Sequence, residues 1–288
     1  MHFLILSILS STFIAVIFKI TDKIKIRLLP VIVINYLTAT LLGYILSDTE
    51  LSINEIYQSD WFYSGLIIGI FLIAGFYLIG YSTQKIGIAI TTISNKMSVV
   101  IPILFSMFYY NESKNIVKFI GILLALLAII LSVYKKNRKK TDYKLVWLPI
   151  LLFIVLGIID SLIKYSQTSL NNETLALFTI LSFGTAGITG IIAAFFNKTK
   201  IVHFFHLKTI LSGILLGTAN FGSMYFIILA LNNSGLDSSI VFGINNVSII
   251  SLSILIAFLI FKEQLKPINW IGIFLSILSI LVLSRIFI

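Results

Sequence analysis

The residues with the clearest chemical potential are Asn95 and Lys96, in the stretch ISNKMSVV inside an otherwise apolar run from 86 to 110. A lysine at the centre of a bilayer costs about 2.5–3.5 kcal/mol on insertion scales. Lys96 is about 12 Å from the Ile88 end of the run at 1.5 Å per helical residue, and its stem spans about half of that. Snorkelling to the surface is therefore insufficient, and we expect a hydrated cavity or a buried carboxylate partner.

Asp160 is the only acid well inside an apolar run, in the stretch IVLGIIDSLIKYSQ. One interpretation is local, because Lys164 follows four residues later and can form an ion pair along the same helix. The other is that Asp160 faces the cavity, with or without Lys96, as a substrate or proton site. The sequence leaves both interpretations open.

Amide and phenol side chains extend the polar inventory of the apolar runs. Hydrogen bonds between membrane helices account for single asparagines at about 0.6 kcal/mol each, and tyrosines commonly form a belt at the membrane surface. Their distribution over several runs favours a shared polar lining instead. The expected substrate-binding residues are Asn35, Tyr77, Asn95, Lys96, Asp160, Asn220, Tyr225 and Asn246.

Several chemistries are disfavoured by the residues that the chain lacks. It has no cysteine, and His203 and His206 have no carboxylate or third ligand nearby, so we expect no metal site. A membrane enzyme needs an acid/base or metal constellation, which a single intramembrane acid does not supply. No Walker-type phosphate loop for ATP is present, and neither catalytic residues nor a cofactor are expected.

Ten apolar runs must position these side chains. The chain is 58% hydrophobic and 11% charged, against about 25% charged residues in soluble domains. A run of about 20 residues spans a bilayer core as a helix. The runs lie at 2–18, 29–46, 61–82, 86–110, 116–134, 145–165, 174–196, 209–231, 236–261 and 267–286. The predicted fold is all-α, a polytopic membrane protein with ten transmembrane helices.

Basic residues border these runs unevenly and give a net charge of +10. Such residues attract anionic headgroups and mark the cytoplasmic side of a membrane, so we expect a lipid bilayer and no nucleic acid as the partner. Most of them lie in alternate connections, at 19–27, 85, 135–144, 198–208 and 262–266. This pattern predicts that both termini lie outside.

The second half of the chain resembles the first. The matches pair 35–46 with 182–193, 64–87 with 212–235 and 111–133 with 262–284. The middle match shares a Gly-x-x-x-Gly, a tyrosine and a closing glycine, and allowing three extra residues places Asn95 on Asn246. Glycines, a tyrosine and a glutamate matching in consecutive order are improbable by chance.

These matches predict two five-helix units, 1–140 and 141–288. Because five is odd, the second unit must enter the membrane from the opposite side. Inverted repeats of this kind occur in many secondary transporters, whose binding sites lie at the midplane between the repeats.

A glutamate stands in the short turn before the last helix of each unit, with a glycine in that helix, in NESKNIVKFIG and KEQLKPINWIG. With the two five-helix units, these residues resemble the EamA-type branch of the drug/metabolite transporter superfamily over essentially the whole chain. The resemblance implies transport of small metabolites, amino acids or related compounds, with export as the direction, and cytoplasmic termini. Family members usually have a proline near the middle of the fourth and the ninth helix. This sequence departs from that pattern, because Pro102 of the run 86–110 is matched by Ser253 of the run 236–261. Glu112 and Glu263, each near a lysine, are interpreted as turn anchors.

The last helix of each unit carries small residues at matched spacing. They are Gly121, Ala125 and Ala128 in the first, and Gly272, Ser276 and Ser279 in the second. Such a face packs closely against a neighbouring helix or a second subunit, which makes a homodimer through these two helices a candidate assembly.

The function predicted from these residues is a secondary transporter of small polar or anionic metabolites, with export as the expected direction, in the cell (inner) membrane. In this interpretation Lys96 attracts an anionic group of the solute, and the two units expose a central cavity alternately. The alternative is a lipid-carrier flippase, which would use a lateral opening, or a scaffolding membrane subunit.

Overall fold

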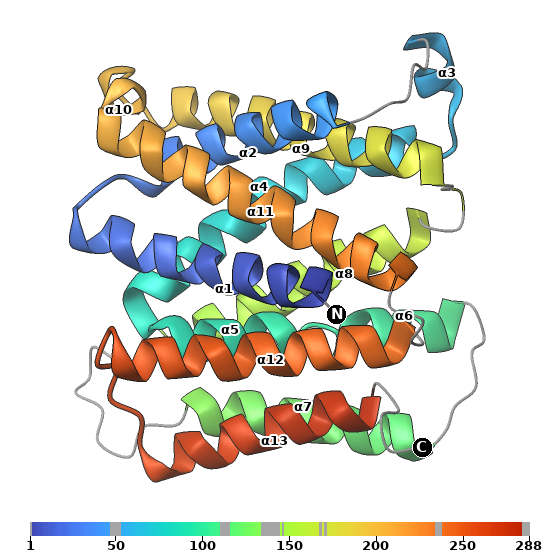
Figure 1. Ribbon diagram of the computed structural model, residues 1–288, viewed down its shortest axis with the longest axis vertical. Coiled ribbons are helices and arrows are strands. Elements are labelled where there is room, and N and C mark those ends of the chain that lie inside the picture. The colour runs from blue at the N-terminus through green and yellow to red at the C-terminus, as the bar shows by residue number, and fades with distance from the viewer. Residues whose placement is uncertain are drawn as a thin grey trace.

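The structure is a computed structural model that describes residues 2–46, 53–109, 116–133, 145, 147–166, 169, 172–233 and 238–283. Every regular element within these ranges is a helix (Figure 1). Eight spans are long and apolar enough to cross a membrane, and two shorter apolar helices, Phe119–Ser132 and Pro267–Leu283, lie in the two remaining predicted runs. The chain is therefore an all-α polytopic membrane protein. Glu112 and the predicted boundary at residue 140 lie outside the described residues.

The helices follow the predicted runs closely. In the first half they are α1 (His2–Lys23), α2 (Leu28–Ile45), α3 (Ile53–Gln58), α4 (Phe62–Ile86), α5 (Ile88–Met97), α6 (Val100–Tyr109) and α7 (Ile116–Val133). In the second half they are α8 (Trp147–Ser166), α9 (Asn172–Phe196), α10 (Val202–Phe205), α11 (Leu207–Asn233), α12 (Ser238–Leu259) and α13 (Pro267–Leu283). The short helices α3 and α10 lie in connections.

Helices from the two halves interlock in a reciprocal way. Helix α1 of the first half packs along α11 of the second half. Its counterpart α8, in the second half, packs along α4 of the first half. Likewise α2 contacts α11 while α9 contacts α4, and the pairs α2–α9, α5–α12 and α7–α13 join corresponding helices directly. This pattern is the one expected of two opposed five-helix units, although the repeat itself stays a prediction.

The shared Gly-x-x-x-Gly segments explain two of these contacts. A Cβ on Gly69 of α4 would lie 2.5 Å from Thr185 Cβ on α9, and a Cβ on Gly217 of α11 would lie 2.6 Å from Thr38 Cβ on α2. Glycine is the residue that lets two membrane helices approach this closely. The two glycines meet threonines that the sequence alignment also pairs.

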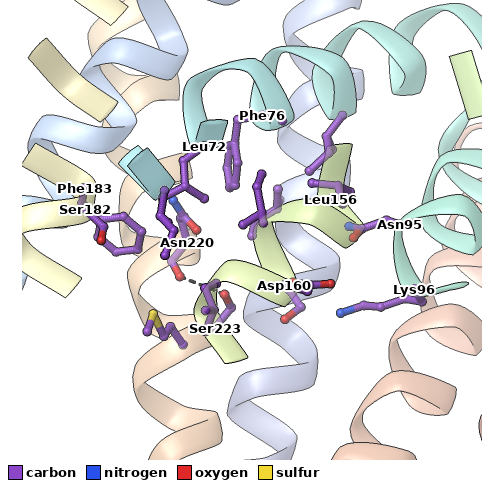
Figure 2. A pocket seen from close by; sticks show the side chains of 18 of the residues that line it. Leu72, Phe76, Asn95, Lys96, Leu156, Asp160, Ser182, Phe183, Asn220 and Ser223 are labelled. Carbon is purple, nitrogen blue, oxygen red and sulfur yellow. Dashed lines mark hydrogen bonds between the residues drawn. The ribbon is translucent and has the colours of Figure 1, made fainter. Parts of the chain in front are cut away.

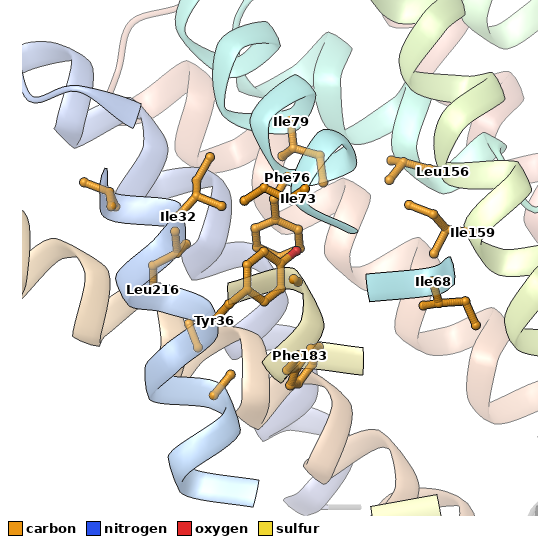
Figure 3. Close-up of a cluster of buried hydrophobic side chains, with 14 of the residues drawn as sticks. Ile32, Tyr36, Ile68, Ile73, Phe76, Ile79, Leu156, Ile159, Phe183 and Leu216 are labelled. Atoms are coloured by element: carbon orange, nitrogen blue, oxygen red, sulfur yellow. The ribbon is translucent and has the colours of Figure 1, made fainter. Parts of the chain in front are cut away.

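The larger hydrophobic core surrounds Tyr36 of α2, which is completely buried (Figure 3). Its ring packs against Phe76 and Phe183, with ring centroids 5.3 and 5.8 Å away, and its hydroxyl donates a 2.9 Å hydrogen bond to the Leu72 carbonyl. A buried tyrosine hydroxyl needs such a partner. The contact ties α2 to α4 and α9 beside the cavity described below.

The predicted run 86–110 forms one candidate span, Ile88–Tyr109, but its helix is interrupted between α5 and α6. Pro102 has no N–H to donate to the Ser98 carbonyl, and its ring crowds that carbonyl. The Ile101 N–H donates to Ser98 O instead, at 2.9 Å, and the helix restarts as α6. The ten-residue helix α5 therefore ends at Met97, directly after Lys96.

The small-residue faces of α7 and α13 pack against each other. A Cβ on Gly272 would lie 2.6 Å from the Ser132 backbone nitrogen, and the Ser279 hydroxyl donates a 2.8 Å hydrogen bond to the Gly121 carbonyl. These faces are thus used within one chain. A homodimer through the two helices stays a prediction and would use their outer, apolar faces.

Candidate functional site

A cavity of about 310 Å³ lies between the two halves. Its lining comes from α1, α4 and α5 of the first half and from α8, α9, α11 and α12 of the second. Apolar side chains, among them Leu72, Phe76, Leu156 and Phe183, form most of the wall (Figure 2). Among the described side chains of α7 and α13, none lines the cavity.

Lys96 and Asp160 both line this cavity. Figure 2 shows the Lys96 amine, from α5, directed toward the Asp160 carboxylate on α8. Asp160 Oδ2 accepts a hydrogen bond of 3.2 Å from the Ser98 hydroxyl, just beyond the end of α5. Since opposite charges favour each other's ionised form across a cavity, each of the two makes the other easier to keep inside the membrane.

The local alternative for Asp160 does not form in the part of the chain that the structure describes. Lys164 is exposed, and no ion pair within 4.0 Å joins it to Asp160. The Asp160 side chain instead turns into the cavity, where a large part of its surface is open. Its chemistry is therefore available to a solute.

A second group of polar side chains lies at another part of the wall. Asn220 of α11 and Ser182 of α9 line the cavity, and both residues are more than nine-tenths buried. The Asn220 Nδ2 and Ser182 Oγ atoms have no hydrogen-bond partner among the described residues. A buried polar group without a partner costs about 1–3 kcal/mol, so water or a solute in the cavity is the natural partner for both.

The eight predicted substrate-binding residues separate into two sets. Asn95, Lys96, Asp160 and Asn220 line the cavity. The other four, Asn35, Tyr77, Tyr225 and Asn246, do not line it.

Each residue of the second set has other surroundings. Asn35 is buried in α2, with its Nδ2 atom 3.4 Å from the Ile32 carbonyl. Tyr77 is 42% exposed and stacks on Tyr81. Asn246 of α12 is partly buried.

Tyr225 lines a separate, smaller and mostly apolar pocket of about 190 Å³. This side pocket lies between the ends of α2, α9 and α11. The rings of Tyr225 and Phe221, which both line it, have centroids 5.5 Å apart. It shares Thr179 and Met224 with the main cavity. The two spaces therefore adjoin.

Several small hydroxyl residues of the site were not predicted. They are Ser11, Thr91, Thr92, Ser98, Thr179, Ser182 and Ser223, of which all but Ser98 line the cavity. Two carried a usable signal: Ser98 follows Lys96 by two residues, and Ser182 aligns with Asn35 in the repeat. The other five carried no signal, because a serine or threonine hydroxyl can also donate a hydrogen bond to a backbone carbonyl of its own helix. The Thr91 hydroxyl donates such a bond, of 2.7 Å, to the Gly87 carbonyl.

The glutamate before α13 anchors a different partner than expected. Glu263 Oε1 lies 3.3 Å from the Lys19 amine of α1, while the neighbouring Lys262 is exposed. Glu263 also accepts hydrogen bonds from the backbone at the start of α5. It lies outside the cavity lining.

The groups that line the cavity among the described residues suit the binding of a small molecule. The cavity offers one cation, one carboxylate and several hydrogen-bonding groups in an apolar enclosure. Apolar pockets with a few convergent polar groups are typical binding sites for small molecules. The arrangement suits a solute with a charged group and an apolar remainder.

Comparisons with known proteins agree with this architecture. Residues 1–134 match the model of the EamA-like transporter family. An uncharacterized protein of Haemophilus influenzae is 28% identical over 286 residues, which cover 97% of this chain and 96% of that protein. With its several membrane-spanning helices, the chain is a multi-pass membrane protein whose residues 1–134 are similar to the EamA-like transporter family.

Proposed function

We propose that the protein is a secondary transporter of the cell (inner) membrane that exports small metabolites carrying an anionic group. The observation that carries this proposal is the placement of Lys96 and Asp160 in one cavity between the two halves. An ionisable residue inside a membrane is by default a functional-site hypothesis. Here it lines a space large enough for a small solute.

The proposed binding mode follows from the two poles of the cavity. The Lys96 amine binds the anionic group of the solute, with the Asn95 amide beside it. Asn220 and Ser182 supply hydrogen bonds to a second polar group, because their side-chain atoms have no partner among the described residues. Phe76 and Phe183 contact the apolar part.

Asp160 gives the proposal a route for coupling to protons. While Asp160 is ionised, it competes with the solute for Lys96. A proton on Asp160 removes that competition and leaves Lys96 free to bind an anion, so solute and proton would leave the cell together, driven by the outward concentration gradient of the solute. Alternating access then requires the two halves to rock about the cavity, as in other transporters built from opposed units.

The alternative function is lipid-carrier translocation, and one feature favours it. The side pocket beside Tyr225 is apolar and adjoins the cavity. It has the character needed to hold a hydrocarbon tail. In that case the protein would move a lipid-linked compound across the membrane, in place of a soluble metabolite.

The test is Lys96→Met, with Val247→Met as the matched control at the corresponding position of α12. Metabolites in medium and cells are compared among cells with the wild-type protein, either variant or none. Charge-assisted hydrogen bonds are worth about 1.5–3 kcal/mol, so the export rate of the responsive anion should fall about tenfold to a hundredfold in Lys96→Met. Val247→Met should retain wild-type export.

Unchanged export in folded Lys96→Met protein would remove Lys96 from the binding site. Accumulation of a lipid-linked compound, without any change in soluble anions, would favour the alternative function. Protein amount and thermal unfolding in detergent verify that each variant is folded.

A further inference from the structure

A cluster of contacts joins the two halves at one end of the helices, outside the cavity. The Lys19 amine of α1 lies 3.3 Å from Glu263 Oε1 and 3.3 Å from the Thr83 carbonyl of α4. The Lys19 and Glu263 side chains are only 18% and 13% exposed. An ion pair this well shielded from water is screened less by salt than a surface pair.

Glu263 also caps the helix that carries the cavity's cation. Its Oε1 accepts a 2.8 Å hydrogen bond from the Ile88 N–H, and its Oε2 a 3.4 Å hydrogen bond from the Ala89 N–H. These two N–H groups belong to the first turn of α5, where a helix has no partners of its own and a positive dipole end. A carboxylate from the second half therefore holds the first turn of a helix from the first half.

Gly87 makes room for this contact. It is the single residue between α4 and α5, and its φ of 101° is strained for any residue with a side chain. A Cβ at this position would lie 2.5 Å from Glu263 Oε2. We name the group of Lys19, Glu263, Gly87 and the Ile88 and Ala89 N–H groups the clasp.

The clasp lies at one end of the membrane-spanning helices, one turn of α5 from the cavity residues Thr91 and Thr92. The connections around 24–27, 198–206 and 260–266 lie together at this end, on the left of Figure 1, and we name it the basic face. Cavity residues occur in the second half of α8, from Leu156 to Ile163, and in the first half of α9, from Phe178 to Phe183. Both stretches lie in the halves of α8 and α9 that are farther from the basic face, whereas Thr91 and Thr92 of α5 line the cavity one turn from the clasp (Figure 1).

We propose that Glu263 is a positioning residue: clamped by Lys19 onto the first turn of α5, it fixes the helix that carries Asn95 and Lys96 and keeps the cavity closed at the basic face. The opening of that face requires the Glu263 carboxylate to leave the Ile88 and Ala89 N–H groups. This inference rests on the proposed function only in treating the closed basic face as one state of a transport cycle. The closure itself can be measured without any solute.

The absence of cysteine from the chain makes the test direct. Thr92 lines the cavity one turn into α5, so Thr92→Cys is introduced as the reporter. A membrane-impermeant thiol reagent is added to sealed vesicles of both orientations. Lys200→Cys, at an exposed position of the basic face, identifies the vesicles in which that face meets the reagent.

With the clasp intact, the Thr92→Cys thiol should react slowly from the basic face and quickly from the opposite face. Adding Glu263→Gln should raise the basic-face rate about tenfold, the effect of losing about 1.4 kcal/mol of a charge-assisted contact. Lys262→Gln, at the adjacent exposed residue, should leave the rate unchanged. Equal basic-face rates with and without Glu263→Gln would overturn the proposal.

A charge exchange separates the helix cap from the ion pair. In Lys19→Glu with Glu263→Lys an ion pair can form again, but a lysine cannot accept hydrogen bonds from the Ile88 and Ala89 N–H groups. Labelling from the basic face should therefore stay fast. Restoration of slow labelling would show that the ion pair alone closes this face and would reject the positioning role.

Gly87→Ala provides a second route if the Glu263 variants do not fold. It leaves both charges in place while its methyl group displaces the carboxylate, so it should also speed labelling from the basic face. Slow labelling in folded Gly87→Ala would contradict the proposal. Because no solute is needed, these rates are independent of the export result for Lys96→Met, which tests the proposed function alone.

Discussion

The broken helix α5–α6 and the continuous helix α12 occupy corresponding places in the predicted repeat, yet they differ in charge, in backbone and in how many residues they supply to the cavity. The first has Lys96, Ser98 and Pro102 where the second has Val247, Ile249 and Ser253. The first supplies several cavity residues, and the second supplies only Ile249 among those described. In the predicted repeat the two helices correspond in position, whereas the cavity lysine and the backbone break belong to α5–α6 alone.

The largest expected effect on stability comes from introducing a proline into α12, at the position that corresponds to Pro102. Ser253 is buried in the middle of α12. A proline there removes a helix hydrogen bond and crowds the preceding turn, so Ser253→Pro should destabilise the folded protein by about 3 kcal/mol. Thermal unfolding in detergent measures this change. Ser253→Ala is the control, and it should be neutral or stabilising because the Ser253 hydroxyl has no partner among the described residues.

A smaller effect, similar in the two halves, is expected from their matched glycine contacts. Gly69→Ala and Gly217→Ala each place a methyl group about 2.5–2.6 Å from an atom of the opposing helix. Overpacking of this kind costs about 1–3 kcal/mol. The same unfolding measurement should give similar losses for both variants. A loss of stability at only one of the two sites would mean that the α4–α9 and α2–α11 contacts are not equivalent.

The smallest effect on stability should come from the polar side chains that α5–α6 has and α12 lacks. Ser98→Ala removes the hydrogen bond to Asp160, with a cost of about 1 kcal/mol. Ile249→Ser is the matched change in α12. If Asp160 is the proton site, Ser98→Ala should shift the pH dependence of anion export, and Ile249→Ser should leave it in place. Identical pH profiles for Ser98→Ala and the wild type would separate Ser98 from Asp160.

The sequence predicted the charged part of the site because a charge in the membrane has few stable environments. For Lys96 this left a hydrated cavity or a buried carboxylate partner, and for Asp160 it left either the local pair with Lys164 or the cavity; the structure places both side chains in one cavity. The position of the helix break was also signalled, by Pro102. The stability of the whole arrangement depends on packing, which periodicity describes only coarsely.

The tyrosines show where sequence reasoning stops. Tyr77 and its neighbour Phe76 differ by one helical step of about 100°, and it is Phe76 that lines the cavity. Helices that are apolar on all sides give no sign of which face turns inward. The rotation of α4 is fixed by close contacts such as Gly69 with Thr185, which are visible only in three dimensions.

The helix pair α7–α13 is fastened near both of its ends. Asn269 Nδ2 donates hydrogen bonds to the Leu131 and Ser132 carbonyls at one end, and Ser279 donates to Gly121 at the other. These hydrogen bonds resist separation of α7 from α13 at both ends, so we expect a sideways exit into the lipid phase to form elsewhere around the bundle.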